Sequence, residues 1–163
     1  MGLDIHSDRG RESLTDEARC VSIIESAYPD WEFLHTQKSR PAAVDGILVW
    51  DGIVRAVVEQ KSRYDLSLDK FRGAFNSEWL VTYDKLRRAA EIAEGLCVPL
   101  VGFLYLVDER IVLSQRLWTP DAGFIQSMRR ERTQTRATIN GGTAVRDNAF
   151  IDMRNARIIY GAG

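Results

Sequence analysis

Residues 42–63, AAVDGILVWDGIVRAVVEQKSR, decide the fold of this chain. Within them, two apolar runs at residues 42–50 and 53–58 flank an Asp51-Gly52 pair. An Asp-Gly pair between two runs rich in β-branched residues is typical of a tight β-hairpin. The stretch therefore predicts two antiparallel strands joined at this pair.

The second strand of this hairpin ends in charged residues. Side chains two positions apart on a strand point to the same face, so Glu59 and Lys61 emerge together while Gln60 turns away. Asp45 stands in the first strand. An acid from one strand, beside an acid and a lysine from its neighbour, can hold a divalent cation and a phosphate.

The length of the turn decides whether Asp45 shares the face of Glu59. A two-residue loop pairs Trp50 with Ile53 and sends the two acids to opposite faces. A three-residue loop pairs Val49 with Ile53 instead and keeps them on one side. The metal interpretation requires this loop or an equivalent bulge. The apolar pattern favours the three-residue loop, because one core face then gathers Val44, Leu48, Trp50, Val54, Ala56 and Val58.

Beyond the hairpin, the apolar spacing predicts one helix, three strands, a second helix and two strands, followed by a β-rich extension. This αβββαββ order implies an α/β or α+β fold, with a mixed central sheet flanked by helices. The expected helices are residues 14–27, begun by a capping box of Ser13 and Asp16, a short turn within 64–76, residues 78–95, and a short helix from Thr119-Pro120. The expected strands outside the hairpin are residues 31–36, 96–107, 111–118, 132–139, 143–146 and 151–160, with a turn at 140–142.

Asp45, followed by Glu59-Gln60-Lys61 at the end of the next strand, resembles the PD-(D/E)xK nucleases, the restriction-endonuclease-like superfamily. The resemblance covers roughly residues 15–113 and includes the order of elements. The chain departs from the family pattern in having Val44 where proline is usual and Gln60 where an apolar residue is usual. The resemblance implies a Mg²⁺- or Mn²⁺-dependent deoxyribonuclease, an endonuclease similar to junction resolvases or to small phage enzymes.

Hydrolysis of a phosphodiester requires neutralised phosphate charge and an activated water molecule. We expect Asp45 and Glu59 to bind the metal and Lys61 to assist the attack, so these three are the predicted catalytic residues. The family resemblance adds the Gln60 carbonyl as a ligand and an acid from the first helix. Glu17 is the expected helix acid, and Glu25 at the other end of that helix competes with it.

Basic residues concentrate in the last third of the chain. Residues 110–163 carry nine arginines, no lysine and four acids, a net charge of +5 that leaves −6 for residues 1–109. Such a segment suits contact with nucleic-acid phosphates. A solvated surface that merely favours arginine is an equally good interpretation. The predicted nucleic-acid contacts are Arg63, Lys85, Arg129 and Arg130.

The bulk composition fits a single globular domain of 163 residues, with a flexible start at 1–12, a core at 13–118 and the extension at 119–163. No apolar run approaches the roughly 20 residues of a membrane span. Cys20 and Cys97 fit buried free thiols in a reducing cytoplasm. We expect a cytoplasmic protein that binds DNA and neither associates with a membrane nor binds an organic cofactor. A homodimer is expected if both DNA strands are cut.

Two other functions stay open on the sequence. The first is a catalytically inactive PD-(D/E)xK fold that serves as a nucleic-acid-binding or assembly subunit. The second is a small α+β binding protein in which the spacing of Asp45, Glu59 and Lys61 is accidental. Metal-dependent cutting of DNA separates the nuclease from both.

Overall fold

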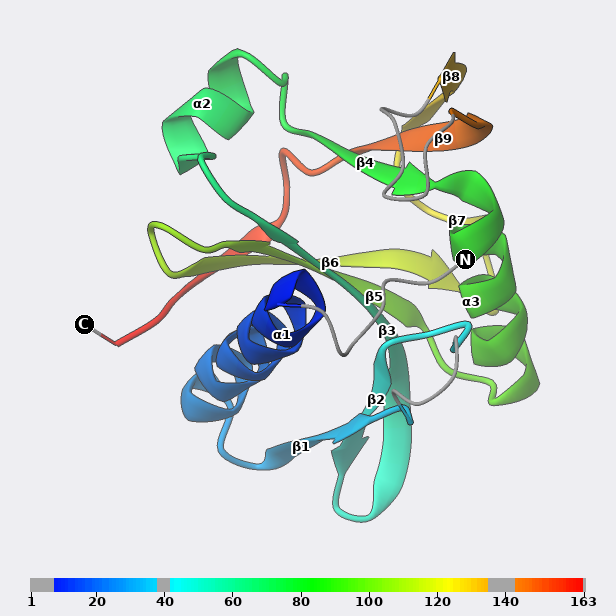
Figure 1. Cartoon of the computed structure of the whole chain (residues 1–163). Coiled ribbons are helices and arrows are strands. Elements are labelled where there is room, and N and C mark those ends of the chain that lie inside the picture. Colours follow the sequence, from blue (N-terminus) through cyan, green and yellow to red (C-terminus); the bar gives the residue numbers. More distant parts are fainter. Residues whose placement is uncertain (1–7, 38–41, 135–142, 163) are drawn as a thin grey trace.

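The structure is a computed structural model that describes residues 8–37, 42–134 and 143–162. It contains a seven-stranded sheet, a three-stranded sheet and two long helices (Figure 1). No helix in these ranges is both long enough and apolar enough to cross a membrane. In chain order the elements are α1 (Asp8–Ala27), β1 (Trp31–His35), β2 (Gly46–Trp50), β3 (Ile53–Arg63), α2 (Leu68–Gly73), β4 (Glu78–Thr82), α3 (Tyr83–Gly95), β5 (Leu100–Leu106), β6 (Ile111–Thr119), β7 (Gly123–Phe124), β8 (Met128–Gln134), β9 (Val145–Asp152) and β10 (Arg157–Tyr160).

The main sheet has the strand order β1-β2-β3-β5-β6-β10, and β7 pairs with the end of β6. Strands β3 and β5 are parallel, whereas the other pairs are antiparallel. Parallel neighbours need a crossover connection, which here includes α2, β4 and α3. The predicted α+β class, with a mixed central sheet flanked by helices, is confirmed.

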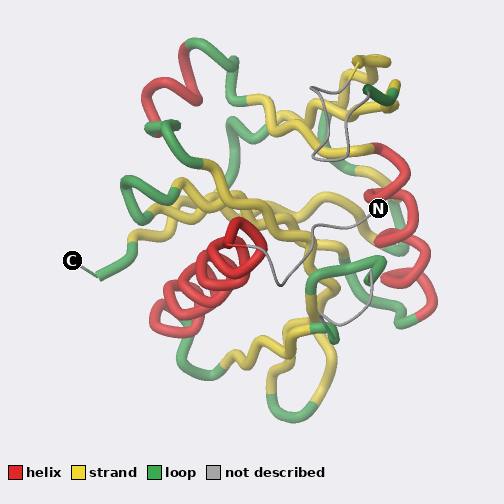
Figure 2. The backbone as a smooth tube through the Cα atoms, viewed as in Figure 1, coloured by secondary structure: helices red, strands yellow, loops and turns green. Residues whose placement is uncertain are grey.

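The two long helices cover opposite faces of the main sheet, as the backbone trace shows (Figure 2). On β3, Val58 packs with Cys20 and Ile24 of α1, whereas Val57 packs with Leu86 and Ala93 of α3. Adjacent strand residues point to opposite faces, so a nearly continuous apolar run is what a strand covered on both sides requires. Burial of each such aliphatic side chain contributes roughly 1.5–3 kcal/mol.

The hairpin turn differs from the favoured prediction. Trp50 pairs directly with Ile53, so the loop has two residues rather than three. Asp51 and Gly52 have φ values of 53° and 69°. Positive φ at both central residues is the type I′ geometry, whose twist matches that of the flanking strands and which Asp-Gly accommodates well.

A β-bulge in β3 restores the register that the metal interpretation requires. Val49 pairs with Val54, but the next residue of β2, Leu48, pairs with Ala56, so Arg55 has no partner of its own in the ladder. An extra residue in one strand moves each side chain beyond it to the opposite face of the sheet, relative to the partner strand. The equivalent bulge anticipated from the sequence is therefore present, although the three-residue loop is wrong.

The predicted core face of the hairpin is only partly correct. Leu48, Ala56 and Val58 pack together beneath α1. Trp50 is 46% exposed at the tip of the hairpin and stacks on Trp31, with 5.9 Å between the ring centroids. Val44 precedes β2 and packs in the cluster beneath α3. Trp50 lies beside the turn at the end of β2, and Val44 lies before the first residue of β2, where strand alternation does not set the facing of a side chain.

Residues 78–82, predicted as the start of a helix, form strand β4. Trp79 and Val81 are buried at alternate positions, and Trp79 pairs with Ile151 of β9. Trp79 and Tyr83 are also four residues apart, so the apolar spacing fits a helix as well as a strand. The partner strand decides between them, since strand preference depends on cross-strand packing.

Other boundaries also differ from the predictions. α1 begins at Asp8, so Ser13 lies inside the helix and the predicted capping box is wrong. The polar first turns of α1 carry no apolar period that would reveal them. Thr119 starts a turn, in which its hydroxyl accepts from the Ala122 N–H at 3.3 Å, rather than a helix. Cys20 is buried as expected, but Cys97 is exposed in the turn that follows α3.

The C-terminal third contributes to both sheets. Strands β8 and β9 join β4 in the three-stranded sheet, while β10 pairs with β6 in the main sheet. The predicted strand at 151–160 is thus two strands of different sheets, separated by a turn. The predicted turn at 140–142 and most of the predicted strand at 132–139 lie outside the described residues, as do residues 1–7.

Candidate active site

The predicted catalytic residues lie where β3 extends beyond its pairing with β2. The ladder between these strands starts at the pair Gly46–Val58, and in the described chain β3 continues to Arg63 with β5 alone beside it. A cavity of about 520 Å³ lies over this free edge of β3. Its walls come from α1, the segment before β2, the end of β3 and the start of α3, through Glu17, Asp45, Gln60, Lys61, Arg63 and Lys85 among others.

Two carboxylates from adjoining segments converge on one ammonium group. Lys85 Nζ lies 2.5 Å from Glu59 Oε1 and 3.5 Å from Asp45 Oδ2. The Asp45 N–H donates to the Val58 carbonyl at 3.1 Å, which extends the ladder one residue beyond β2. Asp45 therefore lies opposite Glu59 and on the same face, as a result of the bulge.

Gln60 links this site to α1 through both its backbone and its side chain. Its N–H donates to Asp45 Oδ2 at 2.8 Å. The N–H and C=O of a strand residue point to the same side, so the Gln60 carbonyl also faces the edge where Asp45 lies. On the opposite face, Gln60 Nε2 donates to the Glu17 carbonyl at 3.1 Å. A polar residue at this position is explained by that bond to the helix.

Burial dominates the electrostatics of Glu59. The side chain is almost inaccessible, and this burial raises its pKa to about 7, with Asp45 adding to the rise while Lys85 and Lys61 oppose it. Burial by itself would lower the pKa of Lys85, but the charges of Glu59 and Asp45 and hydrogen bonds to both raise it overall. Lys85 is thus held as a cation between the two acids.

The pKa of Lys61, unlike that of Lys85, is lowered. Desolvation by the surrounding protein lowers its pKa, and the nearby cations Arg63 and Lys85 lower it further, against the effect of Glu59 and Asp45. A lysine whose pKa is lowered exchanges a proton more readily near neutral pH. Protein surrounds Lys61 closely enough to desolvate its ammonium group in part, but the residue stays accessible to solvent and lines the cavity, so a water molecule or a phosphate can reach it.

The donor set fits a divalent cation with few protein ligands. Glu59 Oε2 is buried and has no hydrogen-bond partner in the described part of the chain. Leaving such an oxygen without a partner costs about 1–3 kcal/mol, and more for a charged group. Within residues 8–37, 42–134 and 143–162, no group of three or more His, Cys, Asp or Glu could hold a metal. Mg²⁺ needs only one or two carboxylates beside water and substrate, which Asp45, Glu59 and the Gln60 carbonyl can supply.

The two candidate helix acids occupy different places. Glu17 lines the cavity, on the turn of α1 that Gln60 contacts. Glu25 accepts a hydrogen bond from the Phe33 N–H at 3.0 Å and so joins α1 to β1. Position in the fold therefore favours Glu17 as the helix acid, although it does not form a three-acid group with Asp45 and Glu59.

Two features of the cavity escaped the sequence. Asp16 is fully buried and accepts a hydrogen bond from the Tyr64 hydroxyl. Lys85, which the sequence predicts as a nucleic-acid contact, bridges the two carboxylates. Neither pairing has a sequence signal, because the partners are far apart in the chain and belong to no repeating pattern.

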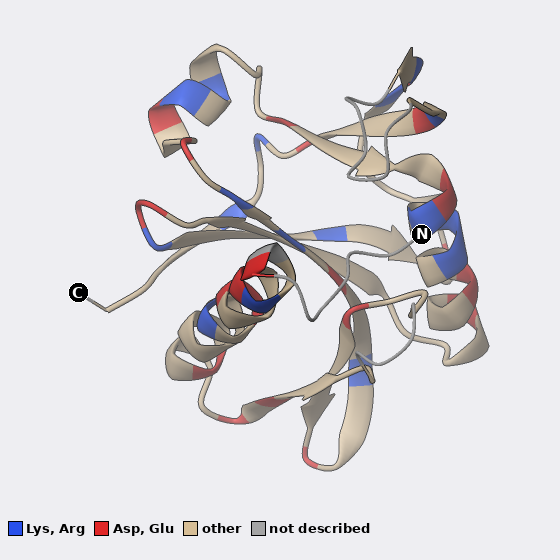
Figure 3. Cartoon of the chain, viewed as in Figure 1, with Lys and Arg blue, Asp and Glu red and all other residues tan. Residues whose placement is uncertain are grey.

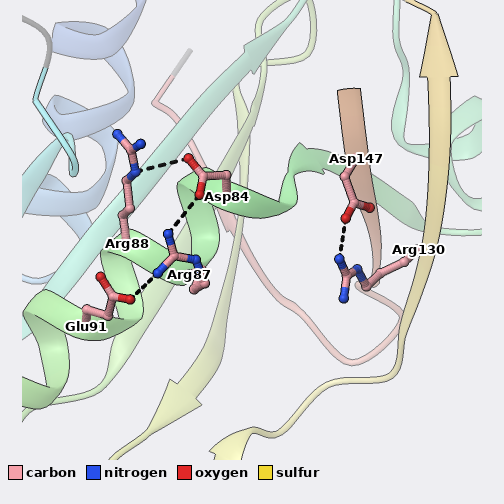
Figure 4. Close-up of polar contacts among 6 residues, drawn as sticks. All are labelled: Asp84, Arg87, Arg88, Glu91, Arg130 and Asp147. Atoms are coloured by element: carbon pink, nitrogen blue, oxygen red, sulfur yellow. Dashed lines mark hydrogen bonds and ion pairs between the residues drawn. The ribbon is translucent and has the colours of Figure 1, made fainter. Parts of the chain in front are cut away.

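The arginines predicted to contact nucleic acid differ in their surroundings. Arg129 forms ion pairs with Glu78 and Glu131, and Arg130 forms one with Asp147. Acidic and basic residues are likewise interspersed along α3, where Asp84 forms ion pairs with both Arg87 and Arg88 (Figures 3 and 4). In contrast, Arg63 lines the cavity and has no ion-pair partner among the residues described.

Comparisons with known proteins add no family. No protein-family model matches the chain. No curated protein matches it either. The PD-(D/E)xK resemblance therefore stays a prediction that depends on the site residues themselves.

Proposed function

We propose that this protein is a metal-dependent nuclease of the PD-(D/E)xK type that hydrolyses phosphodiester bonds in DNA. The observation that carries the proposal is the convergence of Asp45 and the buried Glu59, from adjoining segments, on Lys85. Asp45 and Lys85 line one cavity together with Lys61. Buried acids with a raised pKa in a cleft are common at functional sites. Arg63, which has no ion-pair partner in the described chain, supplies a further cation for a phosphate.

Each site residue has a distinct role in the proposed reaction. Bound Mg²⁺ or Mn²⁺ would supply Lewis-acid polarisation and lower the pKa of a coordinated water molecule. Asp45, Glu59 and the Gln60 carbonyl would hold this cation, and Glu17 would support it from α1. Lys61 orients the attacking water and, in its neutral form, takes up the water's proton; its lowered pKa increases the share of this neutral form. Arg63 binds a non-bridging phosphate oxygen and offsets its charge.

The test is a cleavage assay on plasmid, linear and branched DNA and on RNA, with Mg²⁺, Mn²⁺ or EDTA. We expect cutting of DNA that requires metal and is lost in Asp45→Asn and Lys61→Ala. Asp51→Asn and Arg72→Ala are matched controls, because both residues are exposed and lie outside the cavity. Cutting that persists in Asp45→Asn or in EDTA would contradict the proposal.

One observation favours a second function, a nucleic-acid-binding or assembly subunit without catalysis. The Lys85 ammonium lies between the two carboxylates, where it balances their charge in place of a metal. A structural ion pair of this kind would hold α3 against β3. DNA binding without cutting, unaffected by Asp45→Asn, would support this function. The expected homodimer and cytoplasmic location stay predictions.

A further inference from the structure

A second cavity of the described chain lies beside the candidate active site. It has a volume of about 640 Å³ and extends between α2 and the three-stranded sheet. Figure 1 shows α2 in the connection from the end of β3 to the start of β4. Arg63 and Tyr64 line both this cavity and that of the active site, so the two cavities share a wall. Its volume is within the range of roughly 300–1,000 Å³ that is usual for small-molecule sites.

Aromatic side chains form much of its lining. Phe75 is 49% exposed and Tyr64 is 44% exposed, although both are large and apolar. The Tyr64 hydroxyl donates to the buried Asp16, which fixes the orientation of the ring. Phe71 and Trp79 close the cavity from below, since both are buried. Flat, exposed and partly immobilised rings of this kind suit the face of a nucleobase.

Cations are distributed around the same rings. Arg63 donates hydrogen bonds to the carbonyl oxygens of Ser62 and Leu80, and Lys70 Nζ donates to the Asp65 carbonyl at 3.0 Å. Neither has an ion-pair partner in the described chain. Arg129 lies over the Phe150 ring at 4.0 Å, with Glu78 offsetting its charge. Aromatic faces with cations beside them match a base and the phosphates on either side of it.

We propose that this cavity binds an unpaired nucleotide of the strand being cut, next to the scissile phosphate. The inference rests on the proposed nuclease function, and it names the substrate class as nucleic acid with single-stranded character at the cut. In a duplex the faces of the bases are stacked on one another and cannot reach an aromatic cavity. Arg63 lies on the wall between the cavities, so it can contact the phosphate that joins the bound nucleotide to the cut position.

The test is fluorescence anisotropy in EDTA, where no cutting occurs, with a labelled single strand, a blunt duplex of the same sequence and a duplex with a single-stranded flap. We expect the wild type to bind the single strand and the flap more tightly than the blunt duplex. Phe75→Ala should weaken single-strand binding about fivefold or more, as the loss of one base-stacking contact does. The blunt duplex should bind Phe75→Ala and the wild type equally well.

Matched controls separate this site from general effects. Tyr160→Ala removes an aromatic side chain that is 68% exposed on β10 and outside the cavity. Lys70→Gln should weaken single-strand binding, whereas Arg72→Gln, on the same helix but outside the cavity, should not. Thermal unfolding of each variant verifies that it is folded.

The outcomes distinguish this proposal from the nuclease proposal. Unchanged single-strand binding in Phe75→Ala, or an equal loss with the blunt duplex, would overturn the nucleotide site even if metal-dependent cutting is found. A selective loss in Phe75→Ala without any cutting by the wild type would keep the nucleotide site and overturn only the nuclease. No detectable affinity of the wild type for any of the oligonucleotides would overturn the nucleotide site and point to a peptide or another ligand.

Discussion

Replacing Glu59 with glutamine should make the free energy of unfolding less dependent on pH. Burial raises the pKa of Glu59 from the ordinary value of 4.5 to about 7 in the folded protein. The folded chain therefore holds this proton more tightly than the unfolded chain does, and unfolding releases it between these two values. Stability from this source is full below the unfolded pKa and is lost as the pH rises through the folded pKa.

The size of the effect follows from the shift. At about 1.36 kcal/mol per pKa unit, a rise from 4.5 to about 7 corresponds to about 3 kcal/mol. Most of this change in the free energy of unfolding falls between pH 5 and pH 8. Over that interval the wild type should therefore lose about 2 to 3 kcal/mol more stability than Glu59→Gln. The ion pair to Lys85 adds no separate pH-dependent contribution, because its effect on the ionisation of Glu59 is already contained in the shifted pKa.

Urea unfolding in EDTA at a series of pH values measures this difference directly. Glu94→Gln, which removes an exposed carboxylate from α3, is the matched control and should follow the wild type. Parallel curves for the wild type and Glu59→Gln would refute the reasoning, because Glu59 would then not bind its proton more tightly in the folded state. Mg²⁺ should also stabilise the wild type at pH 8, by about 2.7 kcal/mol at a hundred times its Kd, but not Glu59→Gln.

Three further substitutions test other parts of the structure. Lys61→Ala should abolish cutting yet leave the melting temperature unchanged, since the side chain is exposed; a clearly lower melting temperature would make Lys61 structural. Gly102→Ala would place a Cβ in collision with Cζ3 of the buried Trp79, so denaturant titration should show a loss of about 1–3 kcal/mol. Gly52→Ala meets no neighbouring atom but must adopt a φ of +69°, so a loss of about 1–2 kcal/mol is expected, and an unchanged midpoint would contradict the type I′ turn.

Local patterns predicted much of the main sheet. The hairpin around Asp51-Gly52, the helical spacing that ends at Gly95 and the apolar runs of β5 and β6 lead to the correct fold class. These features have a short range: a turn needs particular φ values, and a strand covered on both faces needs an unbroken apolar run. The pairing of Glu59 and Lys61 on one face follows from strand alternation alone.

The same local reasoning failed where two periods fit the sequence equally well. Trp79 and Tyr83 satisfy a helical spacing, but β9 pairs with residues 78–82 and makes them a strand. β9 lies far along the chain, so no local pattern reveals this pairing. The turn length was also mistaken, because the apolar pattern could be satisfied by a longer loop and the bulge at Arg55 was not distinguishable from it.

The sequence by itself determined that an acid, a second acid and a lysine stand at the ends of neighbouring strands, since chain spacing fixes these positions on a hairpin. Only the tertiary structure decided that Asp45 faces Glu59, because one bulged residue sets the facing of every side chain beyond it. Tertiary packing likewise brought Lys85 between the acids and Tyr64 against Asp16. Contacts between elements distant in the chain depend on how helices dock on the sheet, and no periodicity encodes them.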